Sequence, residues 1–402
     1  MNIKDYILKA FITTIFLYLG VLFITNGCSK DWTEAIRSGN THQEQFRQDV
    51  DIEIKNGLIF LPVSIQGQTY RFLFDTGAPL SISQKIQNAL EYEVVSKGNI
   101  IDSDHNNQEV KWVQVDSILI GDISFQKQVA FIGDFEANPL LSCLEIDGII
   151  GSNLIRHCNW RIDQNNKSTS LFKGIESLDH NEGITIPFKT DHQYNMFVDI
   201  NIGQASLKNV LVDFGSNGSI ALNHEIFTLL QEREILDSGF HENGSIQSGI
   251  VGEKAVLKRS FVYSDSVRIG NITLQDVLLR TGKTVSIGTK FLSQFIVTIN
   301  WDNRTLHLAK DDSHPSLLCF PGFRLGYSND LGMYVQSIVL KSNAYNEGVR
   351  PNMRVIKLDG LDFENGNNFC DYVDHKLSLR ILMELSDSIG SRKIYQFKQT
   401  AR

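Results

Sequence analysis

Two short segments of this chain each place an aspartate after an apolar run and before a glycine. They are Asp75-Thr76-Gly77-Ala78 and Asp213-Phe214-Gly215-Ser216. A pair of carboxyl groups suits hydrolysis, because an ionised carboxylate can take a proton from water while a protonated one donates to the attacked carbonyl. A single aspartate could not do both. The two segments therefore predict one hydrolytic site, provided that the fold brings them together.

The two aspartates also belong to an internal repeat. The apolar segment 147–151 ends at a glycine 76 residues after Asp75, and the segment 285–288 ends at a glycine 75 residues after Asp213. Near-equal spacing of this kind predicts two copies of one structural unit. We expect the copies to face each other across a pseudo-two-fold axis, which would put Asp75 beside Asp213. The alternative is a pair of unrelated strand-turn elements in a β domain.

This pattern resembles the retropepsin and pepsin superfamily of aspartic proteases, in which an apolar-apolar-Gly strand runs beneath each catalytic loop. The resemblance implies a mainly β fold with two pseudo-two-fold related β-barrel lobes, at 51–175 and 184–310. It implies that Asp75 and Asp213 are catalytic and that four neighbours support their loops: Thr76, Gly77, Gly215 and Ser216. The expected substrate is a peptide or protein, cleaved by activated water without a cofactor.

The second loop departs from the family pattern at Phe214, which stands where Thr76 stands in the first. In the family that hydroxyl reaches the opposite lobe, so Phe214 removes one of two symmetric hydrogen bonds, each worth about 0.5 to 1.5 kcal/mol. Ser216 keeps a hydroxyl that in the family bonds the outer oxygen of its own aspartate, whereas Ala78 lacks one, as in the retroviral form. Two functions stay open: an active endopeptidase, and a peptide-binding pseudoprotease whose dyad geometry is lost.

The tripeptide Asp213-Phe214-Gly215 also occurs in protein kinases, where its aspartate binds magnesium. A kinase would need a Gly-rich phosphate loop, a strand lysine motif and a His-Arg-Asp catalytic loop before it, and the chain has none of them. The kinase interpretation is therefore excluded.

A hairpin flap over the substrate is expected in each lobe. The candidate in the first lobe is the segment 100–105, with Ile101 and Asp102 as flap residues. Its counterpart in the second lobe lies near Gly249, within 248–252. Both are placed by position alone, and plain surface hairpins would fit the same residues.

The residues after the second copy predict a third module. The polar segment 310–315 ends in a proline and suits a domain boundary. Residues 320–400 then resemble a small α+β bacterial PDZ domain, with a strand, a Ser-x-Ala-x-x-x-Gly helix and a strand that ends in Asp-Gly. The resemblance implies a loop whose backbone N–H groups hold a peptide carboxylate, at Leu325, Gly326 and Tyr327, with the peptide adding as a strand. A glycine there would also suit a bulge or turn.

The first thirty residues predict export. Two lysines precede an apolar run of fifteen residues, and Gly27-Cys28 follows. The layout resembles a bacterial lipoprotein signal at 1–27, with Cys28 as the lipidated residue. The alternative is an uncleaved anchor, although fifteen residues are short for a membrane span. Residues 28–50 are polar without an apolar period and predict a tether. The expected location is the bacterial cell envelope, at its periplasmic or outer face.

Composition agrees with a folded, exported protein. Of 402 residues, 42% are apolar and 21% charged, which is too apolar for disorder. The net charge of -8 argues against binding to nucleic acid. No His-Glu-x-x-His or paired Cys-x-x-Cys motif is present, so no metal site is predicted. Because both lobes lie in one chain, we expect a monomer.

Four cysteines remain besides Cys28, and an oxidising compartment permits disulfides among them. They are Cys143, Cys158, Cys319 and Cys370. The favoured bridge joins Cys143 to Cys158 within one lobe, because the two flank the strand that ends at Gly151. Four buried free thiols are the alternative.

Overall fold

The computed structural model describes residues 31–102, 105–174, 183–247, 249–250, 254–310 and 319–401. It is mainly β, with 53% of residues in strands and 12% in helices. The predicted signal segment 1–27 and Cys28 lie outside the described residues, as do residues 311–315 of the predicted boundary.

The N-terminal region (31–174) is built around a nine-stranded sheet in the order β1-β9-β6-β10-β5-β4-β8-β7, with β3 beside β4. Its elements are α2 (Trp32–Ala35), β1 (Asn40–Thr41), β2 (Phe46–Asp51), β3 (Glu53–Lys55), β4 (Leu58–Ile65), β5 (Gln68–Phe74), β6 (Ser81–Ser83), α3 (Gln84–Leu90), β7 (Val94–Ile101), β8 (Asn107–Ile120), β9 (Ile123–Gly133), α4 (Pro139–Cys143), β10 (Gly148–Ile150), α5 (Ser152–Ile155), β11 (Asn159–Asp163) and β12 (Ser168–Lys173).

The middle region (183–310) forms a second sheet, in which the order β21-β20-β15-β16-β23-β17-β22-β19-β18 continues into the C-terminal region. Its elements are β13 (Gly183–Pro187), β14 (Lys189–Thr190), β15 (Met196–Ile202), β16 (Ala205–Asp213), β17 (Ile220–Leu222), α6 (His224–Glu232), β18 (Phe240–Gln247), β19 (Lys254–Ser264), β20 (Val267–Ile269), β21 (Ile272–Leu274), β22 (Val277–Thr281), β23 (Ser286–Gly288), α7 (Thr289–Leu292), β24 (Phe295–Asn300) and β25 (Thr305–Lys310).

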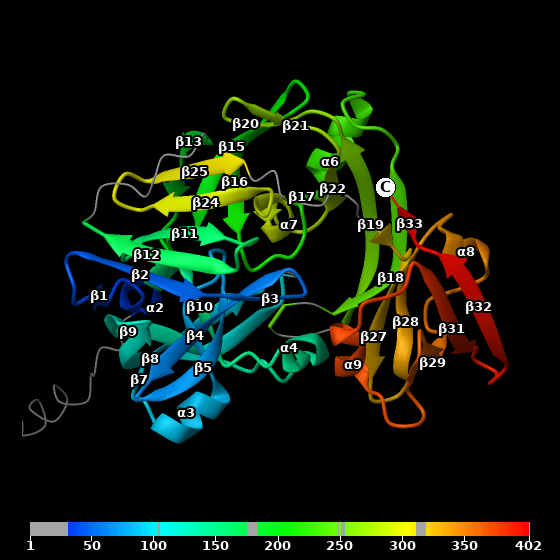
Figure 1. Cartoon of the computed structure of the whole chain (residues 1–402), viewed down its shortest axis with the longest axis horizontal. Helices are drawn as coiled ribbons and strands as arrows, with labels where there is room; N and C mark the ends of the chain where they lie inside the picture. Colours follow the sequence, from blue (N-terminus) through cyan, green and yellow to red (C-terminus); the bar gives the residue numbers. More distant parts are fainter. Residues whose placement is uncertain are drawn as a thin grey trace, which may run out of the picture.

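A six-stranded sheet joins these two regions, in the order β13-β25-β24-β11-β12-β2 (Figure 1). Its central contact is the antiparallel pairing of β11 with β24, in which Trp160 lies opposite Ile299. The buried apolar side chains of both regions form one continuous cluster. The two regions therefore share a core and do not depend on a flexible linker.

The same local arrangement occurs once in each region. β5 pairs in parallel with β10, which pairs antiparallel with β6, while β16 pairs in parallel with β23, which pairs antiparallel with β17. A capped helix follows each time: Ser83 accepts a first-turn N–H of α3, and Asn223 accepts one of α6. This correspondence sets Asp75 and Asp213 at the ends of equivalent strands.

Residues 31–50 are packed against the N-terminal region and are not the polar tether that the sequence predicted. Trp32 stacks on the buried Trp112, with ring centroids 5.1 Å apart, and β2 pairs along its length with β12. Ile36 and Phe46 are buried as well. These apolar residues are few and widely spaced, so they produce no period in the sequence.

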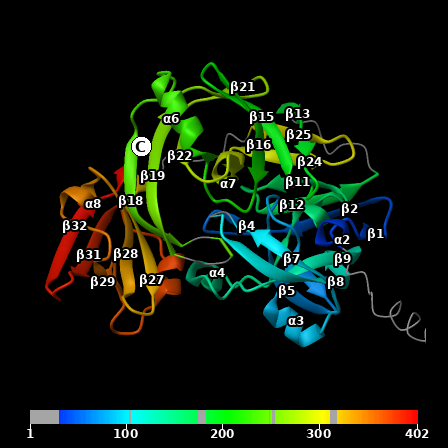
Figure 2. The same cartoon turned by 180° about the vertical axis from the view of Figure 1, so that it is seen from behind.

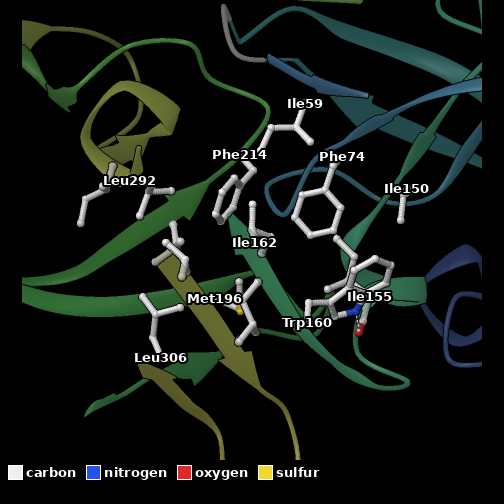
Figure 3. Close-up of a cluster of buried hydrophobic side chains, with 14 of the residues drawn as sticks. Ile59, Phe74, Ile150, Ile155, Trp160, Ile162, Met196, Phe214, Leu292 and Leu306 are labelled. Atoms are coloured by element: carbon white, nitrogen blue, oxygen red, sulfur yellow. Dashed lines mark hydrogen bonds between the residues drawn. The ribbon is translucent and has the colours of Figure 1, made fainter. Parts of the chain in front are cut away.

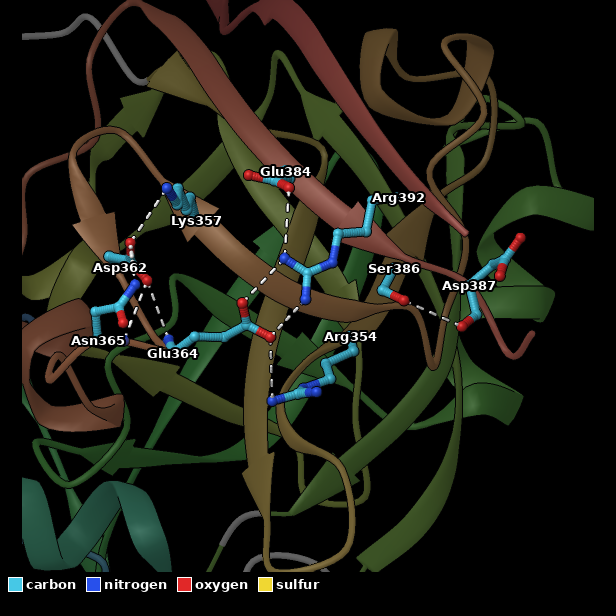
Figure 4. Close-up of polar contacts among 9 residues, drawn as sticks. All are labelled: Arg354, Lys357, Asp362, Glu364, Asn365, Glu384, Ser386, Asp387 and Arg392. Atoms are coloured by element: carbon cyan, nitrogen blue, oxygen red, sulfur yellow. Dashed lines mark hydrogen bonds and ion pairs between the residues drawn. The ribbon is translucent and has the colours of Figure 1, made fainter. Parts of the chain in front are cut away.

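The C-terminal region (319–401) has its own hydrophobic core. Its elements are β26 (Cys319–Phe320), β27 (Phe323–Ser328), β28 (Gly332–Val339), α8 (Asn343–Asn346), β29 (Arg354–Leu358), β30 (Leu361–Asp362), α9 (Phe369–Asp374), β31 (Arg380–Ser386), β32 (Arg392–Lys398) and β33 (Thr400–Ala401). Glu364, in the turn after β30, pairs with Arg392 of β32 at 2.8 Å and with Arg354 of β29 at 3.8 Å (Figure 4). Such exposed pairs add little stability, so the apolar core is what holds this region together.

The C-terminal region is joined to the middle region by a shared sheet and a buried carboxylate. β18 pairs antiparallel with β19 on one side and with β28 on the other, so it links the sheets of the two regions (Figure 2). Glu242 on β18 is fully buried; it lies 3.4 Å from Arg259 and 3.1 Å from Arg324, and it accepts a hydrogen bond from Ser337. A buried carboxylate is tolerated when it is paired and hydrogen-bonded in this way.

The same region is also joined to the N-terminal region, through a disulfide that corrects the predicted one. Cys143 on α4 bonds Cys370 on α9, across 227 residues of sequence, and Cys158 is a buried free thiol. The predicted bridge from Cys143 to Cys158 was wrong because Cys158 packs inside the shared core, whereas Cys143 faces α9. Beside the disulfide, Lys55 forms an ion pair with Asp374 at 2.8 Å.

Candidate active site

The first aspartate lies where β5 leaves its sheet. Phe74 pairs with Ile150 of β10, and the Asp75 N–H continues the ladder by donating to the Ile150 carbonyl at 3.1 Å. The chain then turns, so that the Gly77 N–H donates to Asp75 Oδ1 at 2.8 Å. The backbone thus holds the carboxylate of Asp75 in one orientation.

The second aspartate is held in the same way. Asp213 is the last residue of β16 and pairs with Gly288 of β23. The Gly215 N–H donates to Asp213 Oδ1 at 2.9 Å. Each predicted catalytic loop therefore points the N–H two residues after the aspartate at its own carboxylate.

The two carboxylates lie against each other's loops. A Cβ atom placed on Gly215 would come within 2.2 Å of Asp75 Oδ2, and one on Gly77 would come within 3.0 Å of Asp213 Oδ1. No side chain other than hydrogen fits at Gly215 without moving Asp75, which is the close approach that glycine allows. The structure therefore brings Asp75, Gly77, Asp213 and Gly215 together in one site.

Both aspartates have pKa values close to neutral pH. Burial raises the pKa of Asp75 to about 6, although N–H groups of Gly77 and Gly215 oppose the shift. Burial and then the negative charge of Asp75 raise the pKa of Asp213 to about 7. Two adjacent carboxyl groups with raised pKa values share one proton near neutral pH, so one can act as base and the other as acid.

Thr76 links the two loops across the site. Its hydroxyl donates to the Val212 carbonyl at 2.6 Å and accepts from the Phe214 N–H at 3.1 Å. Phe214 makes no reciprocal bond. Its ring is fully buried and packs edge-on against Phe74, with centroids 5.4 Å apart (Figure 3). Aromatic packing in the shared core thus takes the place of the second hydroxyl.

We expect Thr76→Val to lower the free energy of unfolding by about 1 to 3 kcal/mol, because it leaves the buried Val212 carbonyl and Phe214 N–H without their partner. Thr76→Ser keeps the hydroxyl and is the matched control. Urea unfolding of both variants checks the prediction. Equal stability of Thr76→Val and the wild type would show that the hydroxyl does not hold the loops together.

The hydroxyl of Ser216 does not follow the role that the resemblance implied. It lies 3.5 Å from the Gly218 N–H and 3.4 Å from Arg280 Nη2, while the Ser216 backbone N–H lowers the pKa of Asp213. Arg280 was missed by the sequence reasoning, although it directly follows three apolar residues of strand β22. Its positive charge also lowers the pKa of Asp213, against the larger effect of burial. A lone arginine in an apolar strand is the signal that could have identified it.

The predicted flap residues lie at two hairpin tips that meet. Ile101 ends β7 and Asp102 follows it, while Gly249 lies beyond the end of β18. A Cβ atom on Gly249 would come within 2.4 Å of Asp102 Oδ2, and Asn138 Nδ2 donates to the Gly249 carbonyl at 3.0 Å. Residues 103, 104, 248, 251 and 252 of the two predicted segments lie outside the described residues.

Leu325, Gly326 and Tyr327 belong to strand β27 and not to the loop that the sequence predicted. The strand has a bulge between Arg324 and Leu325, next to Gly326. A bulge is the alternative that the sequence left open for this glycine. The Leu325 N–H interacts with the Tyr372 hydroxyl of α9, whose pKa is raised mainly by burial. These residues are far from the aspartates in sequence, and Leu325 packs in the separate core of the C-terminal region.

Two features are absent from the described ranges. No helix among those residues is both long and apolar enough to cross a bilayer. Nowhere in the same ranges do three His, Cys, Asp or Glu side chains gather where they could hold a metal ion.

Residues 61–154 match a protein-family model described as "Aspartyl protease". The matched segment contains Asp75 with its loop and strand β10, and it ends before Asp213. No curated protein matches the chain. The match supports an aspartic protease family and a protease-type enzyme. It does not cover the middle region, so the place of Asp213 in the site rests on the loop geometry described above.

Proposed function

We propose that this chain is an aspartic endopeptidase that hydrolyses peptide bonds with Asp75, Asp213 and an activated water. One observation carries the proposal: the glycine of each loop lies directly against the carboxylate of the other, so the two carboxyl groups face a common point. The family match to residues 61–154 supports the same activity.

The catalytic cycle uses the shared proton. The ionised carboxylate takes a proton from the water that attacks the peptide carbonyl, and the protonated carboxyl donates to the carbonyl oxygen as it becomes tetrahedral. The roles then reverse as the leaving nitrogen is protonated. Gly77 and Gly215 N–H groups orient the two carboxylates throughout and require no movement of the loops.

The contacts of Phe214 favour the enzyme over a pseudoprotease. The loss of one hydroxyl would matter if the second loop were displaced, but the Phe214 N–H still reaches Thr76 and the ring fills the core beside Phe74. Asp213 also pairs with Gly288 in the unbroken parallel register of β16 with β23. These contacts support our proposal that the two loops are arranged for catalysis.

In this proposal the N-terminal and middle regions are the duplicated lobes, at 51–175 and 184–310, and residues 320–400 are a PDZ-like domain that binds peptide or protein ends. Strand β27 pairs with no strand other than β28 among the described residues, and an added peptide strand would take the place of the contact between the Leu325 N–H and the Tyr372 hydroxyl. Lipidation at Cys28 would tether this monomeric enzyme to the bacterial envelope. That anchor rests on the signal-like sequence of residues 1–27.

The proposal is tested with the whole chain purified in detergent and a mixed peptide library, with cleavage products identified by mass spectrometry. We expect internal cuts that a peptide with a hydroxyl group in place of the scissile carbonyl inhibits, because it mimics the tetrahedral state. A folded chain that cuts no peptide and binds the inhibitor no better than its parent peptide would contradict the proposed activity.

We expect kcat/KM to follow a bell-shaped pH profile with its maximum between about pH 6 and pH 7, where Asp75 and Asp213 have their raised pKa values. At lower pH both carboxyl groups are protonated and neither accepts a proton from water. At higher pH both are ionised and neither donates. Assays from about pH 4 to pH 9, with circular dichroism at each pH to confirm folding, check the prediction. A maximum below about pH 4 would show that the carboxyl groups keep their ordinary pKa values.

A further inference from the structure

Helix α9 covers one edge of strand β27. Among the described residues β27 pairs with β28 alone, so the backbone groups on its other side take part in no strand pairing. α9 lies beside β27, between it and α4 (Figure 1). Its Tyr372 hydroxyl meets the Leu325 N–H, and its Phe369 ring stacks on Tyr327 with centroids 6.4 Å apart. An extended peptide could add to β27 only if α9 moved away.

Other residues of α9 fasten it to the N-terminal region. Val373 packs against a buried apolar cluster of that region, and Asp374 forms its ion pair with Lys55 at 2.8 Å. The disulfide from Cys370 to Cys143 adds a covalent link to α4. α9 is therefore held between the core of the C-terminal region and the N-terminal region, and one of its attachments is a bond that reduction can open.

The disulfide decides how much of the molecule must move when α9 leaves β27. The segments on either side of α9, 363–368 and 375–379, contain neither helix nor strand. An exposed ion pair contributes little, and a peptide strand on β27 would replace the contact of the Leu325 N–H with backbone hydrogen bonds of its own. With the bridge open, displacement of α9 is therefore a local event. With the bridge closed, the same displacement must also move α4.

We propose that the Cys143–Cys370 disulfide is a redox-controlled lock on the C-terminal region. While the bridge is closed it holds α9 against the edge of β27, and its reduction by a dithiol lets α9 give way to an extended peptide. The inference rests on the proposed peptide-binding function of residues 320–400. The closed and open states differ in their affinity for the peptide, which is what allows the bridge to control binding.

The opening step is a thiol–disulfide exchange. Cys143 is buried whereas Cys370 is partly exposed, so the thiolate of the dithiol attacks Cys370 Sγ. The bond between the two sulfurs breaks, and Cys143 leaves as a thiolate that takes up a proton. The second thiol of the reductant then displaces Cys370 as a thiol and closes the reductant's own disulfide. Two electrons thus pass from the dithiol to the bridge.

The test uses the whole chain in detergent with Asp213→Asn, which prevents cleavage, and an array of synthetic heptapeptides with free C-termini. The chain is applied oxidised, and again after dithiothreitol, with thiol titration to show that the bridge has opened. The heptapeptide captured most strongly by the reduced chain is then labelled and titrated by fluorescence anisotropy. We expect its Kd to be about tenfold lower for the reduced chain than for the oxidised chain.

Three variants, each built on Asp213→Asn, test the lock itself. Cys143→Ser combined with Cys370→Ser should bind the heptapeptide as tightly as the reduced chain, and dithiothreitol should not change its Kd. Tyr372→Phe keeps the ring but removes the hydroxyl from the Leu325 N–H, so its oxidised form should bind about threefold more tightly than the oxidised parent. Cys158→Ala removes the free thiol and is the matched control, which should keep the full effect of dithiothreitol.

Hydrogen exchange shows where the heptapeptide binds. Protection of β27 by the heptapeptide in the reduced chain supports the lock, whereas protection confined to the loops of Asp75 and Asp213 would overturn it. Equal Kd values in the two redox states, with the heptapeptide on β27, would also overturn the lock but leave the peptide-binding function in place. If neither state captures any heptapeptide, that function fails together with the lock. The endopeptidase activity is judged separately, because the binding assay needs no cleavage.

Discussion

Asp213→Asn is expected to lower kcat by at least about a thousandfold, and Asp75→Asn by a similar factor, because each variant leaves the dyad without one of its two proton-transfer partners. The amide is close in size to the carboxyl group and can still accept the N–H of the residue two positions later. The loss would therefore be chemical and not structural. Steady-state cleavage of the best library peptide, with the double variant as the background, measures it.

Stability at different pH values provides the control for this prediction. Asp213 has its pKa raised from 3.8 to about 7, so the folded state binds its proton more tightly than the unfolded state does. Native stability therefore falls as the pH rises through that range, where the folded chain must ionise a buried, repelled carboxyl group. Asp213→Asn removes that cost. At about pH 8 the variant should be more stable than the wild type by on the order of 2 kcal/mol, and the difference should vanish near pH 4.

Thermal unfolding at the two pH values separates the possible outcomes. An inactive variant that is more stable at about pH 8 supports a strained, shared-proton dyad. An inactive variant that is less stable at both pH values would mean that the amide disturbs the loop. An Asp213→Asn variant that cleaves peptides as well as the wild type would refute the two-aspartate mechanism.

The local structure of the loops that carry Asp75 and Asp213 was predictable because its sequence signals are local. An apolar strand, an aspartate and a glycine two residues later predict a strand that ends in a tight turn, and the 76- and 75-residue spacings relate the two copies. The effect of Phe214 was not predictable in the same way. The sequence indicates a lost hydroxyl, but only the three-dimensional packing places its ring against Phe74.

The missed features all depend on contacts between distant segments. Arg280 reaches the loop of Asp213 because β22 runs parallel to β17, a pairing that the sequence alone does not specify. Trp32 stands in a polar stretch of the sequence, and only the fold brings it against Trp112. The cysteine pairing failed for the same reason, because nearness in sequence was taken as a guide to nearness in space.

Removal of the Cys143–Cys370 disulfide is expected to lower the free energy of unfolding by about 2 to 4 kcal/mol, since the bridge restricts the unfolded chain across a long loop. The double variant Cys143→Ser with Cys370→Ser tests this in urea unfolding. Adding a reductant to the wild type should reproduce the loss, and adding it to the double variant should change nothing. If the reduced wild type, with the bridge shown to be open by thiol titration, unfolds at the oxidised midpoint, the bridge is not stabilising.

The two attachments of the C-terminal region predict where the effect of this disulfide will appear. The pairing of β18 with β28 and the buried cluster around Glu242 remain when the bridge is cut, so the region should stay attached to the middle region. The contact of the N-terminal region with α9 then rests on the ion pair of Lys55 in β3 with Asp374 and on apolar packing by Val373, and exposed ion pairs contribute little. Hydrogen exchange should therefore accelerate in α4 and α9 while β18 and β28 stay protected. Equal acceleration in all four elements would instead mean that the disulfide holds the whole C-terminal region in place.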